Sequence, residues 1–184
     1  TKRKKDGYEK SLETFADEEA DIRIGTQMIV KGHDVPKVTL VGVLAADLSL
    51  YSDDYRSGER TFQLLTQAAG RAGRGAASGQ VVIQTYSPDH YSIETAARQD
   101  YEAFYEEEIR YREMMGYPPT AHLLAVLLSA EDEEKLTAAS AYLRGFAARL
   151  GASGQLVVIG PASPYVGKVS DVYRKILYLK CEKY

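Results

Sequence analysis

Two consecutive prolines beyond the middle of the chain constrain its fold more than any other feature. Pro118 and Pro119 follow a long helical pattern that ends at Gly116. Because proline lacks a backbone N–H and its ring clashes with the preceding turn, no helix continues through this pair. The hydrophobic pattern also changes at this point. We therefore expect two domains, residues 1–116 and residues 117–184.

The first part of the chain alternates apolar runs with amphipathic runs. This pattern predicts helices over residues 10–20 and 57–69 and strands over residues 22–24, 38–44 and 80–86. Continuous apolar runs are typical of strands covered on both faces, and alternation with helices is typical of an α/β layer. Ligands bind in such layers beyond the carboxyl ends of the strands, where Gly25, Thr26 and Asp47 are expected.

A long helical stretch closes the first part. It covers residues 88–115 and is expected to break near Gln99 and Asp100, where Asp100 caps the second helix. Two glutamates of this stretch each precede an arginine by four residues, which favours ion pairs along the helix surface. We therefore expect the acidic side chains of the helix to lie on a solvated face. These pairs are Glu106 with Arg110 and Glu108 with Arg112.

The second part has the pattern of a small α+β domain. Strands are expected over 122–128, 156–159 and 172–179. Ser129 is expected to cap a helix that ends at Gly151 and has its apolar face at Leu136, Ala139, Leu143, Phe146 and Leu150. This order begins a ferredoxin-like sandwich. The segment 172–184 is expected to present an unpaired edge, because the ferredoxin-like domain continues with another helix and strand.

Two arginines stand three residues apart at the end of the expected helix 57–69. Residues 67–74 read Gln-Ala-Ala-Gly-Arg-Ala-Gly-Arg, so Arg71 and Arg74 lie in a turn that two glycines keep open. Arginine keeps its charge and offers a planar fork of donors, which suits contact with the γ-phosphate of a nucleotide. Basic residues after a helix also satisfy its last carbonyls and its dipole, which would explain one of the two.

Further motifs make the sequence more specific. Residues 25–34 read Gly-Thr-Gln-Met-Ile-Val-Lys-Gly-His-Asp and resemble the fifth motif of superfamily 2 helicases, and residues 67–74 resemble the sixth. With the runs 38–47, 114–119, 159–162 and 173–174, the chain is similar over nearly its whole length to the primosomal protein N′ family of replication-restart helicases. The resemblance implies a partial RecA-like helicase lobe, the second of the motor, followed by a truncated ferredoxin-like α+β domain.

The resemblance assigns nucleotide contacts to the two motifs. Gln67 would contact the γ-phosphate or the attacking water, and Arg71 and Arg74 would neutralise charge on the transferred phosphoryl group, with Arg74 as the arginine finger. Gly32 and Asp34 would lie at the nucleotide. Lys31 stands where the superfamily has arginine, so a bidentate contact is not carried over to it. His33, between them, is interpreted as a structural residue.

DNA contacts are expected in both parts. The resemblance places Gly25 and Thr26 against a backbone phosphate. Near the C-terminus, cations alternate with aromatic rings, a mixture suited to phosphate contact beside base stacking. These residues are the cations Lys168, Arg174 and Lys175 and the tyrosines Tyr165, Tyr173 and Tyr178. Asp47 either couples the nucleotide site to DNA or caps a loop at the end of its strand.

Missing motifs limit what the chain does alone. It has no Gly-x-x-x-x-Gly-Lys-Ser/Thr loop and no Asp-Glu-x-His, so ATP and Mg²⁺ would be bound mainly by the other motor lobe. The family carries zinc on a cysteine cluster, but the only cysteine here is Cys181, which excludes a zinc site in these residues. The N-terminus reads Thr-Lys-Arg-Lys-Lys without an apolar stretch, which predicts no signal peptide.

The resemblance also implies a function and partners. We expect a part of an ATP-dependent 3′–5′ DNA helicase of the bacterial cytoplasm and nucleoid that restarts stalled forks and assembles the primosome. Its partners would be forked and single-stranded DNA, single-stranded-DNA-binding protein and other primosome proteins, with no membrane. Two alternatives stay open, namely a fork-binding scaffold without turnover and a fork-remodelling helicase of the RecG kind. The intact Gln67, Arg71 and Arg74 favour the motor, because a scaffold needs no phosphate sensor.

Overall fold

A computed structural model describes residues 11, 13–17, 19–26, 38–73, 78–151, 154 and 156–182. The chain divides into two compact units, Thr1–Phe104 and Tyr105–Tyr184. The division falls inside one helix, α4 (Tyr101–Met115), and the predicted boundary at Gly116 follows the end of the same helix. In the part of the chain that is described, no helix has both the length and the apolar character needed to cross a bilayer.

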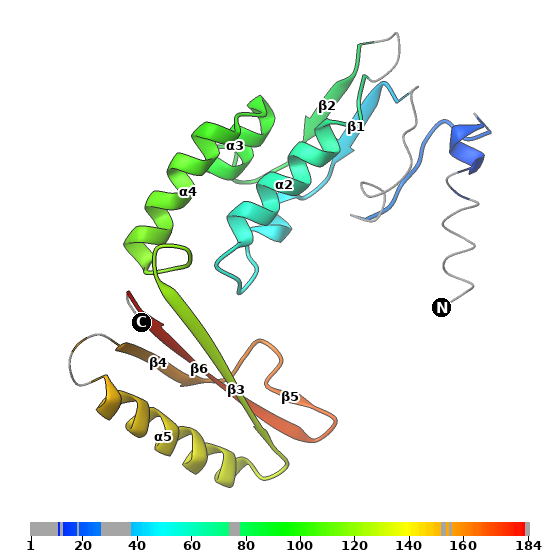
Figure 1. Ribbon diagram of the computed structural model, residues 1–184. Coiled ribbons are helices and arrows are strands. Elements are labelled where there is room, and N and C mark those ends of the chain that lie inside the picture. The colour runs from blue at the N-terminus through cyan, green and yellow to red at the C-terminus, as the bar shows by residue number, and fades with distance from the viewer. Residues whose placement is uncertain are drawn as a thin grey trace. The chain divides into compact units, whose positions relative to one another are not determined.

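The first unit contains the predicted α/β layer. Strands β1 (Leu40–Val43) and β2 (Gln80–Ile83) pair in parallel, with Leu40 opposite Gln80 and Val43 opposite Ile83. Helix α2 connects the two strands, as Figure 1 shows. The remaining elements are η2 (Ala46–Ser49), α2 (Ser57–Ala69), α3 (Tyr91–Arg98) and the first turn of α4. Helix 57–69 is confirmed at both ends.

Two predictions for the strands are wrong. Residues 22–24 form no strand, and Ile22 and Ile24 are 78% and 89% exposed. A run of three residues is too short to define a strand without a neighbour to pair with. The parallel strands are also not covered on both faces, because burial alternates along each strand and Leu40 and Val82 are at least half exposed. Before them, the described residues between 11 and 16 are helical, within the helix predicted for 10–20.

Aromatic stacking holds the helices of the first unit together. Phe62 of α2 stacks on Phe104 of α4 with ring centroids 4.2 Å apart, and both side chains are about 95% buried. Burial of rings of this size contributes on the order of 2 kcal/mol each. The break between α3 and α4 is confirmed, since the Asp100 carboxylate accepts from the N–H of Ala103 at 3.0 Å. Helix α3 begins at Tyr91, with His90 as its cap, and not at Pro88.

The second unit is one antiparallel sheet with a helix on one face (Figure 1). Its strand order is β3-β6-β4, and β5 also pairs with β6. The bounds are β3 (His122–Ala130), α5 (Glu133–Leu150), β4 (Leu156–Ala162), β5 (Lys168–Val169) and β6 (Val172–Cys181). The strand predicted to be an unpaired edge is therefore the central one. The order β-α-β-β with the third strand in the middle is that of the first half of a ferredoxin-like sandwich.

Helix α5 has a different start and face from those predicted. Its cap is Asp132, whose carboxylate accepts from the N–H of Lys135 at 3.0 Å, while Ser129 lies within β3. The strand extends beyond the predicted end and moves the start of the helix. Leu136 is buried as predicted, but Phe146 and Leu150 are 45% and 67% exposed. The other buried residues of the face are Ser140 and Ala147.

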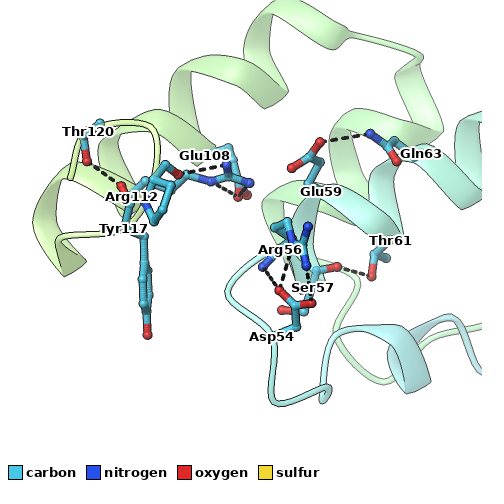
Figure 2. Close-up of polar contacts among 11 residues, drawn as sticks. Asp54, Arg56, Ser57, Glu59, Thr61, Gln63, Glu108, Arg112, Tyr117 and Thr120 are labelled. Carbon is cyan, nitrogen blue, oxygen red and sulfur yellow. Dashed lines mark hydrogen bonds and ion pairs between the residues drawn. The ribbon is translucent and has the colours of Figure 1, made fainter. Parts of the chain in front are cut away.

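The acidic run of α4 is only partly solvated. Arg110 bonds Glu107 at 2.9 Å on the surface and lies 3.9 Å from the predicted partner Glu106. By contrast, the pair Glu108–Arg112 is buried, with the nearest nitrogen and oxygen 2.7 Å apart (Figure 2). Arg112 also donates to the carbonyl of Pro118 at 3.1 Å. The pair therefore fixes the turn after α4 to the helix itself, and its prediction as a solvated pair is wrong.

Removing Arg112 tests this buried ion pair. We expect Arg112→Ala to lower the free energy of unfolding by about 3 to 5 kcal/mol, because Glu108 would stay buried without a counter-charge. Urea unfolding of the 184-residue chain followed by far-UV circular dichroism measures the loss. The variant Glu108→Gln/Arg112→Met removes both charges and is expected to recover most of the stability.

The matched control for this test is Arg110→Ala. Arg110 is an arginine of the same helix whose ion pairs are exposed. Exposed pairs are worth little, so the loss should stay within about 0.5 kcal/mol. Equal losses for Arg110→Ala and Arg112→Ala would contradict the role given to the buried pair.

Candidate nucleotide and DNA site

The end of α2 brings two of the predicted phosphate-sensing residues together. After Ala69 the backbone tightens, with the N–H of Arg71 donating to Ala68 at 3.1 Å and that of Ala72 to Ala69 at 3.2 Å. Gln67 is exposed in the last turn of the helix, and Arg71 follows it four residues later in half-buried surroundings. The two residues therefore lie within about one turn of each other.

The two glycines of this turn have different roles. Gly70 has φ −65°, which any residue adopts. Gly73 has φ +74°, and its N–H donates to the carbonyl of Val38 at 3.0 Å. A Cβ on Gly73 would lie 2.7 Å from the N of Gly79, and a Cβ on Gly79 would overlap the N of Gly73. The interpretation that both glycines keep the turn open is therefore wrong, since Gly73 fastens the turn to the strands.

Gly79 is a contributor that sequence reasoning missed. It stands one residue before β2 and outside the helicase motif, so the motif gives no reason to select it. The only signal is its position before the strand, where a glycine allows close approach of another backbone segment. The contact between Gly73 and Gly79 therefore holds the turn that carries Arg71 against the segment before β2.

Other predicted nucleotide residues lie outside the described part of the chain. Arg74, Gly32, Asp34, Lys31 and His33 all belong to this group. Gly25 and Thr26 are described and are exposed in a segment without regular secondary structure.

Asp47 caps a loop, which is one of its two predicted roles. It lies after β1, is 5% exposed, and accepts from the hydroxyl of Thr85 at 2.6 Å and the N–H groups of Tyr86 and Ser87 at 3.0 and 3.2 Å. These donors follow β2, so Asp47 joins the carboxyl ends of both strands. The turn of Gly73 is bonded to Val38, before β1, and thus lies at the amino end. Asp47 and the arginine turn are at opposite ends of the strand pair.

Hydrogen bonding to the carboxylate sets the charge state of Asp47. The bond from Thr85, followed by that from the N–H of Tyr86, lowers the pKa of Asp47, and desolvation opposes them. A pKa that is lower in the folded state stabilises the fold above the unfolded value of about 3.9. This stabilisation is lost as the pH falls through the folded pKa.

Asp47→Asn tests this linkage. We expect a lower urea midpoint at pH 7, because an amide has no charge and turns a donor toward the donors of the loop. The difference from the unmodified chain should shrink as the pH is lowered below about 4. Asp53→Asn, at an exposed neighbouring carboxylate, is the control and should leave the midpoint at pH 7 unchanged. A difference for Asp47→Asn that grows on acidification would contradict the assignment.

The predicted DNA cations of the second unit do not share one surface. Lys168 is opposite Tyr173 in the β5–β6 pair, so both side chains lie on the same side of the sheet. Arg174 and Lys175 are neighbours on β6 and therefore point to opposite sides. Lys175 lies on the side of Lys168, and Arg174 lies on the side of Tyr178.

Lys168 is already engaged by neighbouring groups. Its ammonium lies 3.0 Å from the carboxylate of Asp171, 3.4 Å from the hydroxyl of Tyr173 and 4.5 Å from the centre of that ring. The bond to Asp171, and then that to Tyr173, raises the pKa of Lys168. Its charge is therefore partly balanced before any phosphate is bound.

Comparison with known proteins places these motifs in a longer protein. No family model matches the chain. It is similar to replication restart protein PriA of Bacillus subtilis, with 45% identity over 175 residues that cover 95% of this chain and 22% of that protein. For the protein of the same name from Synechocystis, identity is 39% over 98% of this chain and 22% of that protein. For the protein of the same name from Thermotoga maritima, identity is 37% over 93% of this chain and 23% of that protein.

The extent of these matches defines what they identify. The chain spans about a fifth of the length of the curated relatives it matches. Within that stretch, the similarity includes both helicase-like motifs and the small α+β unit. The chain is therefore related, over nearly its whole length, to one part of replication restart protein PriA.

Proposed function

We propose that the chain is the part of an ATP-dependent 3′–5′ DNA helicase that completes the nucleotide site and contacts DNA. The observation that carries this proposal is the turn after α2, where Gly73 is held at φ +74° against Gly79 and Val38. A turn fixed in this way presents Gln67 and Arg71 from a rigid base. Preorganised donors of this kind stabilise charge that develops during phosphoryl transfer.

The roles follow from the chemistry of each side chain. Gln67 orients the attacking water or contacts the γ-phosphate, and Arg71 and Arg74 neutralise the charge of the transferred group. Gly32 and Asp34 contribute to the nucleotide pocket. ATP and Mg²⁺ are bound mainly by residues of the protein outside these 184, and zinc is likewise held elsewhere in it.

DNA and proteins are the proposed partners. Gly25 and Thr26 contact a backbone phosphate of the translocated strand, and Arg174 supplies a cation in the second unit. Lys168 and Lys175 lie on the other side of the sheet and take no part in this contact. The proposed partners are forked and single-stranded DNA, single-stranded-DNA-binding protein and other primosome proteins. The protein restarts stalled replication forks in the bacterial cytoplasm. The relatives are replication restart proteins, which supports the restart role.

A first test uses the 184-residue chain by itself. We expect no ATP turnover, with or without single-stranded DNA, because the chain has neither a phosphate loop nor magnesium carboxylates. A steady-state phosphate-release assay on the purified chain measures this. Turnover above the buffer blank would contradict the division of the site between this chain and the rest of the protein.

A second test concerns Arg74 in the longer protein. We expect Arg74→Ala to reduce ATP turnover by about 10³-fold or more while nucleotide affinity stays nearly unchanged, since a finger acts on charge that appears in the transition state. Arg71→Ala should damage both. Phosphate release and nucleotide titration separate the two effects.

The control for the Arg74 test is Arg98→Ala. Arg98 is an exposed arginine paired with Glu94 at 2.9 Å. This variant should keep full turnover. Retention of more than about a tenth of the rate by Arg74→Ala would rule out the finger role, because fingers are worth at least about 10³.

A further inference from the structure

The sheet of the second unit has one covered face and one open face. Leu177 in the centre of β6 is fully buried on the side of α5, and Leu156 on the same side lies beside the end of that helix at Gly151. Because side chains alternate along a strand, the neighbours Ile176 and Tyr178 point to the other side. On that side Leu127, Val157 and Ile159 are 56%, 55% and 45% exposed.

An aromatic ring lies in the middle of this open face. Tyr178 is opposite Ala125 on β3 and Ile159 on β4. Since residues directly opposite in an antiparallel pair lie on the same side, all three belong to the open face. Ala125 has only a methyl group and is exposed, and the Tyr178 ring is partly exposed. The face is thus apolar and aromatic.

Its charge is of one sign. The strands of this sheet contain no aspartate or glutamate, although the chain has 26 acidic residues. On the open side, Arg174 stands toward one end of β6 and Lys180 toward the other. They are six residues apart, which is about 20 Å along a strand. An apolar, aromatic surface between two cations is complementary to an anionic ligand with flat apolar groups.

Two more tyrosines extend the aromatic surface at the Lys180 end. The Lys180 ammonium lies 3.8 Å from the ring centre of Tyr117 and donates to the carbonyl of Met115 at 2.9 Å. The rings of Tyr111 and Tyr117 are 6.2 Å apart. Burial raises the pKa of Tyr117, and the charges of Tyr111 and Tyr178 raise it further. The turn held by Arg112 therefore adjoins the open face.

We propose that single-stranded nucleic acid binds across this open face, with bases stacked on Tyr178 and phosphates at Arg174 and Lys180. The inference rests on the proposed DNA-binding function and names its surface. Unpaired bases offer the flat apolar groups that stack on aromatic side chains, whereas the bases of a duplex are already stacked. The side that carries Lys168 and Lys175 is excluded from this surface by the alternation of β6.

Adjacent residues on opposite faces provide the test. Arg174→Gln and Lys175→Gln remove the same charge from neighbouring positions of β6. Binding of fluorescein-labelled oligothymidylate to the 184-residue chain is measured by anisotropy at several salt concentrations. We expect Arg174→Gln to weaken binding several-fold and to reduce the salt slope by about 0.7, the value for one phosphate contact on a single strand. Lys175→Gln should change neither.

Tyr178 gives the second arm of the test. Tyr178→Leu keeps an apolar side chain on the strand but removes the ring, and we expect about fivefold or more weaker binding. Tyr178→Phe keeps the ring and should bind within about twofold of the unmodified chain. Circular dichroism confirms that each variant is folded. Oligothymidylate that contains 5-iodouracil should cross-link to the peptide of Tyr178 and not to that of Tyr142, an exposed tyrosine on α5.

Several outcomes would overturn the inference. These are equal losses for Arg174→Gln and Lys175→Gln, unchanged binding by Tyr178→Leu, competition by a duplex as strong as by a single strand, or no binding even at low salt. In the last case the open face belongs to a protein partner. ATP turnover of the longer protein is independent of all these readouts, so failure of the proposed helicase activity and failure of this surface are distinguishable.

Discussion

The backbones of Gly73 and Gly79 approach each other so closely that neither position has room for a Cβ atom. This contact fastens the end of α2 to the segment before β2, while the N–H of Gly73 reaches Val38 before β1. A helix end tied to both strands of a parallel pair cannot shift without breaking the pair. The position of Arg71 therefore depends on two residues that have no side chain.

A different constraint orders the second unit. The Glu108–Arg112 pair is buried and fixes the carbonyl of Pro118, so the turn that ends α4 has a defined path. Burying charges costs free energy, and an exposed ion pair would stabilise this turn very little. The same turn presents Tyr117 to Lys180 on β6. Charge pairing within the helix thus determines where an aromatic group meets the sheet.

The sequence was informative wherever a local signal decides the structure. The bounds of α2 follow from apolar periodicity, and the break at Asp100 follows from a capping carboxylate; both signals act within a few residues. The alternation of apolar and amphipathic runs predicted the α/β layer to which the parallel β1–β2 pair belongs. Ser129 failed as a cap because its strand pairs further with β6, which no local pattern reveals. The same long-range pairing made β6 central, and the burial of Glu108 depends on packing across the unit. For the site, the motifs selected Gln67 and Arg71 but not Gly79, whose role exists only through its contact with Gly73.

The alternation of side chains along β6 also places two neighbouring cations on opposite faces of the sheet. The sequence shows Arg174 and Lys175 as one basic dipeptide, and charge counting treats them alike. In the sheet they face opposite sides, Arg174 on the side of Tyr178 and Lys175 on the side of Lys168, whose charge Asp171 partly balances. A polyanion that follows one face meets only one of them. In the proposed nucleic-acid interface, the register of the central strand decides which cations meet the ligand, and the basic character of the C-terminal segment by itself does not.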